Sequence, residues 1–252
     1  DHWGWGKRGA GGGGLDEVRT HWGFLGIEGD CFKASFKCIS RTMKYLDCPS
    51  LSAASAELAG VDLGDHLLDV KLEAYSCKIA GIDKKLTRSL EQRYMDVLSA
   101  SSPQLSCSPV GPLTDPSSRR LLINLICTLN ASNPDHDFSN ISVDQLSREK
   151  DTNMVITRID SALETAYHIL GRSYRERLWN AVDQVIRVHE CEIYSFSADE
   201  DSEDSVDGRL WSFHVLFYNR KMKKVLLFSC ASVMHTSDVV LDDEDVQFGM
   251  DD

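Results

Sequence analysis

The sequence has 252 residues, of which 42% are hydrophobic, and this is enough to form one globular core. No apolar run approaches the roughly 20 residues that span a bilayer, and the start of the chain lacks the apolar core of a signal peptide. We therefore expect a soluble intracellular protein with no membrane segment. The net charge of −12 argues against a nucleic-acid-binding protein, which gains affinity by neutralising phosphates with basic side chains.

The negative charge is concentrated in two segments. Residues 199–207 contain six acids and no base, and residues 238–252 contain seven acids and no base. The rest of the chain has 26 acids against 27 bases, since the two segments hold 13 of the 39 acids. We expect a nearly neutral folded body with an acidic loop at 199–208 and a disordered acidic tail at 236–252. Such segments suit a protein that binds basic surfaces, although they also serve simply to keep proteins soluble.

Residues 1–42 contain the glycine run Gly11–Gly14 and show no sustained hydrophobic period. We interpret them as an extension that is disordered or not native to the protein, and we assign them no function. The folded domain is expected to run from residue 43 to residue 235.

The first part of this domain combines two helical patterns with one strand pattern. A short helix is predicted after Ser50, because apolar residues follow at a spacing of three or four, and it ends at Gly60. Alternating apolar residues predict a strand over 67–79. A polar amphipathic helix is predicted over 83–98.

Residues 99–118 hold four of the six prolines and eight serines or threonines, a composition that predicts a mobile linker. Ser102 and Ser108 each precede a proline, and Thr87 follows two lysines in a pattern typical of basophilic kinase sites. These patterns are common by chance, but a phosphate would add a charge of about −1.5 to −2 to a movable segment. Ser102, Ser108 and Thr87 are our candidate phosphorylation sites.

The central part of the chain is predicted to be mainly helical. Ser118 is predicted to cap a helix over 119–130, which Pro134 stops. Asp135–Lys150 is predicted to be a loop. A long amphipathic helix is predicted over 152–170, before Gly171.

The last block begins with a predicted helix over 174–189, for which Ser173 and Glu176 have the spacing of a capping box. Strands are predicted over 191–196, 209–219 and 223–230. The last two strands form a hairpin, so the sheet is expected to be antiparallel. In the 209–219 strand both sets of alternating residues are largely apolar, which predicts cover on both faces. The fold class is therefore an α/β (α+β) sandwich, an antiparallel sheet covered by helices in a single domain.

The sequence argues against a metal site and against a catalytic site. His189 with Cys191, and Cys31 with Cys38, lack the paired spacing of structural zinc sites. Cys191, His189 and Asp183 could form a nucleophilic site only if an adjoining helix and strand converged, and no common catalytic motif occurs. We expect reduced cysteines, no metal, no cofactor and no enzymatic activity.

A basic cluster occupies the hairpin connection, and it has two interpretations. Charged residues at such a turn protect the edge of a sheet from pairing with other chains. An exposed basic turn can also be recognised by a nuclear import receptor. The cluster consists of Arg220, Lys221, Lys223 and Lys224.

Three stretches, in this order, resemble the Maf-type repressors of RNA polymerase III transcription, and the pattern begins near Met43. The first is LEAYSCKIAG (Leu72–Gly81) and the second is SRRLLINLICTLNASNPDHDFS (Ser118–Ser139). The third combines LWNAVD, ECEIYSF and LWSFHVLFYNRKMKKVLLFSC between residues 178 and 230. The sequence is similar to a plant-like or other eukaryotic member of this family.

The resemblance implies a negative regulator that binds RNA polymerase III at its clamp and the TFIIB-related initiation factor, and so blocks promoter recruitment. It also implies that growth-signalling kinases, including the target-of-rapamycin kinase, and opposing phosphatases act on the linker. The basic cluster matches a nuclear-targeting position, so the protein is expected to shuttle between nucleus and cytoplasm. No direct contact with nucleic acid or membrane is implied.

We hypothesise that the acidic segments complement basic polymerase surfaces. The candidate partner-binding residues are Asp199, Glu200, Asp201, Glu203, Asp204, Asp207 and Trp211, with Asp242–Asp245 in the tail. Two alternatives stay open at this point. One is a phosphorylation-regulated acidic adaptor with a different partner, and the other is an enzyme with an unrecognised site.

Overall fold

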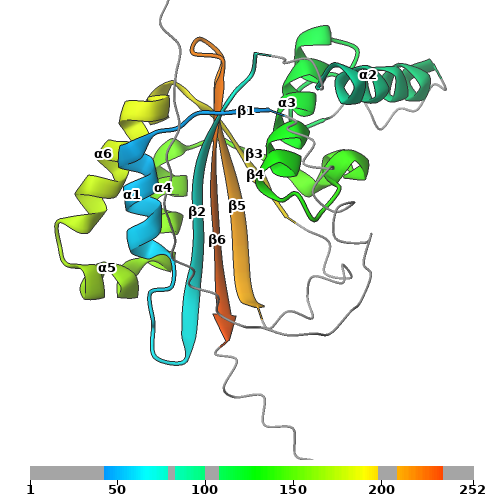
Figure 1. The fold of residues 1–252 in the computed structure, drawn as a ribbon. Helices are drawn as coiled ribbons and strands as arrows, with labels where there is room; N and C mark the ends of the chain where they lie inside the picture. Colours follow the sequence, from blue (N-terminus) through cyan, green and yellow to red (C-terminus); the bar gives the residue numbers. More distant parts are fainter. Residues whose placement is uncertain (1–42, 79–82, 100–107, 198–208, 235–252) are drawn as a thin grey trace, which may run out of the picture. The chain divides into compact units, whose positions relative to one another are not determined.

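The computed structural model describes residues 43–78, 83–99, 108–197 and 209–234. These residues belong to one compact unit and form a six-stranded antiparallel sheet with helices on both faces (Figure 1). The strands are β1 (Lys44–Tyr45), β2 (His66–Ser76), β3 (Leu146–Glu149), β4 (Glu192–Phe196), β5 (Arg209–Asn219) and β6 (Lys224–Met234). The helices are α1 (Pro49–Leu58), α2 (Asp83–Ser99), α3 (Pro116–Ser132), α4 (Thr152–Ala162), α5 (Glu164–Leu170) and α6 (Tyr174–Ile186). The predicted fold class is confirmed.

The strand order is β1-β2-β6-β5-β4-β3, so the last strand in the sequence lies inside the sheet. Strand β6 pairs along its whole length with β2, from His66 opposite Met234 to Ser76 opposite Lys224. It also pairs with β5. A strand with partners on both sides and helices on both faces is expected to be largely apolar, and Val225–Phe228 is fully buried.

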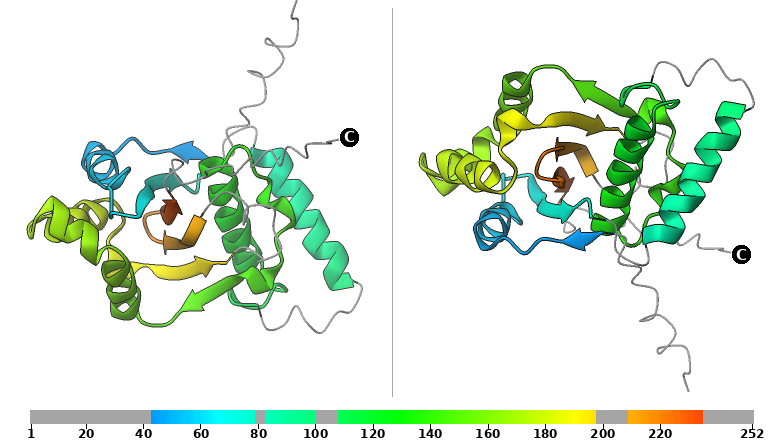
Figure 2. Two further views of the ribbon diagram at one scale, coloured as in Figure 1. Left: turned by 90° about the horizontal axis from the view of Figure 1, so that it is seen from below. Right: turned by 90° about the horizontal axis from the view of Figure 1, so that it is seen from above.

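Two cores flank the sheet. The first core lies under α1, α4, α5 and α6, and the second lies under α3, with α2 packed on the far side of α3 (Figure 2). Alternate residues of β5 enter different cores, because successive side chains of a strand point to opposite faces. Val215 and Phe217 lie in the first core, and Leu216 and Tyr218 lie in the second. The predicted cover on both faces of this strand is confirmed.

Helix α3 begins earlier than the sequence predicts. Its N-cap is Asp115, whose carboxylate accepts a hydrogen bond of 3.1 Å from the Ser117 backbone N–H. Pro116 takes the first helical position, where a proline loses no hydrogen bond. The prediction that Ser118 caps this helix was wrong, because both residues are good N-caps and the earlier one is used.

The predicted linker 99–118 is likewise corrected over its second half. Val110 and Leu113 are buried in the second core, at 6% and 0% exposure. Two turns shape this stretch: the Gly111 N–H donates to the Ser108 carbonyl at 2.9 Å, and the Asp115 N–H donates to the Pro112 carbonyl at 3.0 Å. Residues 100–107 lie outside the described residues.

The predicted loop over Asp135–Lys150 contains strand β3. This short strand pairs with β4, from Leu146 opposite Phe196 to Glu149 opposite Ile193. Its sequence is too short and too polar to predict a strand, and the pairing with β4 decides its conformation. The two-residue strand β1 was missed for the same reason.

The predicted helix over 152–170 is divided into α4 and α5. The division lies at Leu163, whose backbone angles (φ −100°, ψ 5°) depart from the helix while its side chain is fully buried. Gly171 ends α5 as predicted, with a φ of 96° that side-chain-bearing residues rarely adopt.

Helix α6 ends at Ile186, three residues before the predicted end. Arg187 adopts a left-handed conformation (φ 54°, ψ 77°), and Val188–Glu190 forms a 3-10 turn. The predicted capping box was wrong, because Ser173 has a helical backbone and its side chain caps nothing.

Several predicted segments lie outside the described residues: the extension 1–42, the acidic loop 199–208 and the acidic tail 236–252. Within the ranges that the structure describes, no helix is long and apolar enough to cross a membrane.

Candidate functional site

The basic hairpin between β5 and β6 is exposed at its tip. The side chains of Arg220 and Lys221 are 60% and 82% exposed, and Lys223 is also exposed. Lys223 has a positive φ of 53°, which closes the turn. Lys224 differs from the other three, because it begins β6 and its ammonium donates a hydrogen bond to the Val185 carbonyl at 3.2 Å. The structure therefore presents three of the four predicted basic residues at the tip.

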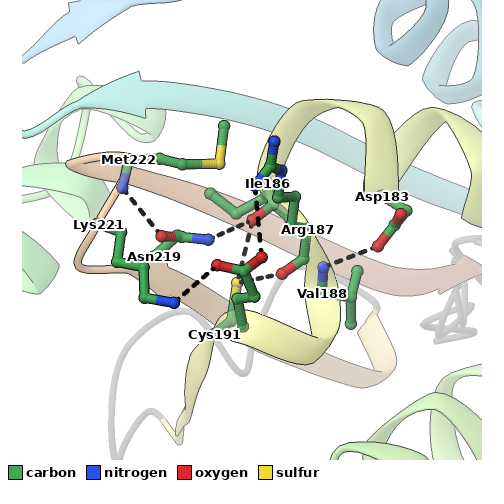
Figure 3. Close-up of polar contacts among 9 residues, drawn as sticks. Asp183, Ile186, Arg187, Val188, Cys191, Asn219, Lys221 and Met222 are labelled. Atoms are coloured by element: carbon green, nitrogen blue, oxygen red, sulfur yellow. Dashed lines mark hydrogen bonds and ion pairs between the residues drawn. The ribbon is translucent and has the colours of Figure 1, made fainter.

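The hairpin is bound to the C-terminal end of α6 (Figure 3). Asn219, which is fully buried, donates from Nδ2 to the Ile186 carbonyl at 2.8 Å and accepts at Oδ1 from the Met222 backbone N–H at 3.0 Å. The last carbonyls of a helix have no partner within the helix, so side chains from elsewhere must satisfy them. Asn219 and Lys224 do this here and fix the hairpin against α6.

The hypothetical nucleophilic set of Cys191, His189 and Asp183 is not assembled. The Cys191 thiol donates to the carbonyls of Ile186 and Arg187 at 3.5 and 3.4 Å, and burial raises its pKa to about 12. The Asp183 carboxylate accepts from the Val188 backbone N–H at 3.0 Å. Both side chains therefore complete the end of α6 (Figure 3). No group of three metal-ligating side chains occurs within the described ranges.

Trp211 lies at the margin of the first core and is half-buried. Its ring stacks on Phe213, with the ring centroids 6.0 Å apart and the planes at 2° to each other. The ring centroids of Phe213 and Phe228 are also 6.0 Å apart. The aromatic row holds Trp211 in place while part of the indole faces solvent. A rigid, partly exposed tryptophan is a common anchor in protein interfaces, and Trp211 stays a candidate of this kind.

A cleft of about 930 Å³ lies between α2, the start of α3 and the hairpin. Thr87 lines this cleft, together with the cations Lys78, Arg120, Arg220 and Lys223. These residues come from four separate parts of the chain, and no local sequence pattern indicates that they meet. The cleft therefore brings one candidate phosphorylation site next to part of the basic hairpin.

Helix α2 is held beside α3 by the buried Arg119. Its Nε donates to the Glu91 carboxylate at 2.7 Å, and its Nη1 donates to the carbonyls of Leu113 and Thr114 at 2.8 and 3.1 Å. Sequence reasoning missed Arg119, because a charged residue at the start of a helix looks like part of a solvated face. The one feature that could have indicated its burial is its position on a side of α3 that also carries apolar residues.

The other predicted site residues are placed as follows. Ser108 is half-exposed and begins a turn, with its Oγ 3.3 Å from the Val110 backbone N–H, which donates to it. Ser102 and the acidic residues Asp199, Glu200, Asp201, Glu203, Asp204 and Asp207 lie outside the described residues.

Residues 68–229, from the start of β2 to β6, match the Maf1 regulator family. The chain belongs to this family. The resemblance seen in the three sequence stretches is thereby confirmed.

The chain is similar to members of this family over most of their length. The repressor of RNA polymerase III transcription from Dictyostelium discoideum is 30% identical, and the alignment covers 75% of this chain and 84% of that protein. The repressor of RNA polymerase III transcription maf1 from Schizosaccharomyces pombe is 33% identical, with 74% and 82% covered. The crystal structure of citrus MAF1 superimposes with a TM-score of 0.57 at 32% identity, covering 74% of this chain and 99% of that one.

Proposed function

We propose that this chain is a negative regulator of transcription by RNA polymerase III. The observation that carries the proposal is its similarity to two proteins named as repressors of RNA polymerase III transcription, which it covers over 84% and 82% of their length. The near neutrality of the body outside the two acidic segments also supports it, since a repressor that acts on proteins needs no surface for DNA phosphates.

In the proposed mechanism the protein binds the polymerase and its TFIIB-related initiation factor, and thereby blocks recruitment to promoters. The body supplies shape and anchors such as Trp211, which is held by its stack on Phe213. The acidic segment 199–207 supplies charge that complements basic surfaces of the polymerase, which otherwise face DNA.

Control by phosphorylation and by localisation completes the proposal. Kinases and phosphatases of growth signalling act on Ser102, Ser108 or Thr87, and of these Thr87 and Ser108 are half-exposed. The exposed tip Arg220, Lys221 and Lys223 directs the protein to the nucleus, and the protein shuttles between nucleus and cytoplasm. The exposure of this tip supports the proposed nuclear targeting.

The test is a reconstituted RNA polymerase III reaction on a transfer-RNA gene with purified full-length chain. We expect transcript yield to fall when the chain is added before the initiation factors and polymerase assemble, and to fall less when it is added afterwards. A promoter for RNA polymerase II serves as the control and should be unaffected.

A second arm replaces the six acids of 199–207 with asparagine and glutamine. Because complementary charge steers association, binding to the polymerase should weaken on the order of tenfold at low salt and lose part of its salt dependence. The matched control contains the same residues of 199–207 in a different order, which keeps the charge and should keep the affinity. Unchanged transcript yield together with no affinity for the polymerase would refute the proposed function.

A further inference from the structure

The cleft between α2, α3 and the hairpin holds more positive than negative charge. Four cations line it, Lys78, Arg120, Arg220 and Lys223, against two carboxylates, Glu91 and Asp115. Both carboxylates already have partners: Glu91 accepts from Arg119 at 2.7 Å, and Asp115 accepts from the Ser117 backbone N–H at 3.1 Å. Asp115 also occupies the N-terminus of α3, so the helix end is not the anion site.

Three of the four cations have no acidic partner in the part of the chain that the structure describes. Among the described residues, the side chains of Lys78, Arg120 and Lys223 form no hydrogen bond or ion pair, whereas Arg220 lies 3.3 Å from Glu192. Burial raises the pKa of the Tyr218 hydroxyl, and the cations of Arg220 and Arg120 act in the opposite direction. Both guanidinium groups therefore act on the Tyr218 hydroxyl, and all three side chains line the cleft. Uncompensated cations that converge on one hollow favour an anionic ligand.

Thr87 is the hydroxyl-bearing side chain that α2 presents to these cations. It lines the cleft and lies one helical turn before Glu91, so both side chains are on the same face of the helix. The ion pair from Glu91 to Arg119 directs this face toward α3, where Arg120 is the next residue. Two lysines precede Thr87 at the spacing of a basophilic kinase site.

We propose that the cleft is an intramolecular phosphate site, in which a phosphate carried by Thr87 is bound by Arg120, Lys78 and Lys223. The proposal rests on the phosphorylation control included in the proposed function. A basophilic protein kinase supplies the group from ATP: the Thr87 oxygen bonds to the γ-phosphorus, its proton passes to the base of the kinase, and ADP leaves. The product carries a charge of about −1.5 to −2, enough to offset the excess of the cleft.

The bound phosphate ties α2 to the hairpin across the cleft. It also withdraws Lys223 from the exposed basic tip, so modification at Thr87 changes a surface more than 130 residues away in the sequence. Arginine suits this task because its planar donors match the oxygens of a phosphate. A threonine fixed inside the cleft delivers its phosphate at a high effective concentration, whereas a free phosphate ion must be captured from solution.

The test uses the full chain with phosphothreonine incorporated at position 87, and measures the second pKa of the phosphate by phosphorus NMR. When no other residue is substituted, we expect this pKa to lie below its ordinary value near 6 by about half a unit or more, since nearby cations favour the dianion. The melting temperature should also rise on phosphorylation.

The variant Arg120→Gln with Lys223→Gln should return the phosphate to its ordinary pKa and remove the rise in melting temperature. Both residues are exposed, so the variant should fold. The matched control is Lys150→Gln with Arg172→Gln, which also removes one lysine and one arginine from exposed positions that do not line the cleft. An equal phosphate pKa in the two double variants overturns the proposal.

A last arm adds inorganic phosphate to the unphosphorylated chain. If Arg120 and Lys223 are needed to bind the free ion while the phosphate on Thr87 titrates normally, the site takes its anion from solution and the intramolecular proposal is wrong. None of these three readouts involves the polymerase, so the outcomes are independent of the transcription assay.

Discussion

His214 is a titratable side chain in the middle of β5 that is largely but not fully buried. It packs against Phe196 with the ring centroids 5.8 Å apart, and its Nδ1 has no hydrogen-bond partner among the described residues. Burial lowers the pKa of His214 to about 4, and the cations Arg209 and Lys71 act in the same direction. The fold therefore holds this imidazole in its neutral form.

This histidine makes stability depend on pH in a defined window. Between about 6.5, the ordinary pKa, and about 4, the unfolded chain binds a proton that the folded chain excludes. The free energy of unfolding should therefore fall as the pH falls through this window, by about 3 kcal/mol at most. The variant His214→Phe keeps an aromatic ring against Phe196 and removes the titration. Urea unfolding at pH 7, 6, 5 and 4 should show a shallower loss for the variant, and equal losses would contradict this origin.

At the scale of elements, the joint between the hairpin and α6 depends on one buried amide. Asn219 links the Ile186 carbonyl to the Met222 N–H, so the variant Asn219→Ala leaves one buried and one half-buried backbone group with fewer partners. We expect this change to lower the free energy of unfolding by about 1–3 kcal/mol. Urea denaturation of the full chain measures it.

The neighbouring substitution Arg220→Ala is the control for this experiment. It removes an exposed ion pair with Glu192 at 3.3 Å, which is worth about 1 kcal/mol or less. If the two variants unfold at the same urea concentration, the amide of Asn219 does not hold the joint.

The sequence predicts those elements whose own residues carry a clear hydrophobic pattern. Strand β5 alternates apolar residues on both faces over eleven positions, and its limits were predicted correctly as 209–219. Strand β3 could not be predicted, because Leu146–Glu149 becomes a strand only through its partner β4. The start of α3 was missed because Asp115 and Ser118 are both suitable caps, and the choice depends on the burial of Leu113 before them.

The candidate site was predicted only in part for a similar reason. The basic hairpin is contiguous in the sequence, so its exposed tip could be predicted from residues 219–224 alone. The cleft joins Lys78, Thr87, Arg120 and Lys223, which come from four separate elements or connections and meet only after the sheet, α2 and α3 have packed together. The role of Lys224 could not be predicted from its residue type, because it is basic like its neighbours but caps the end of α6.

At the scale of the whole molecule, the exposed tip should decide where the protein accumulates. We expect the triple variant Arg220→Gln, Lys221→Gln and Lys223→Gln to lose most of its nuclear accumulation, because an import receptor needs the positive side chains. Fluorescence imaging of the tagged full chain measures the ratio of nuclear to cytoplasmic signal. The variant should remain folded, since the surface ion pairs that it loses contribute about 1 kcal/mol or less each.

The control removes three exposed basic residues elsewhere, Lys44, Lys150 and Arg172. It changes the net charge by the same amount and should leave the nuclear signal unchanged. If the two triple variants were distributed equally between nucleus and cytoplasm, the tip would not be a nuclear import signal.

The position of β6 has a consequence for how the protein is made. Its two neighbours, β2 and β5, leave the ribosome first, and β2 does so when more than half of the chain is still to be translated. Until β6 is made, β2 has an open edge on the side that β6 will cover, and such an edge invites pairing with other chains. A message truncated before the codons of β6 would therefore yield an aggregating product and not a weakened repressor. We expect chaperones to bind the nascent chain from the synthesis of β2 until that of β6.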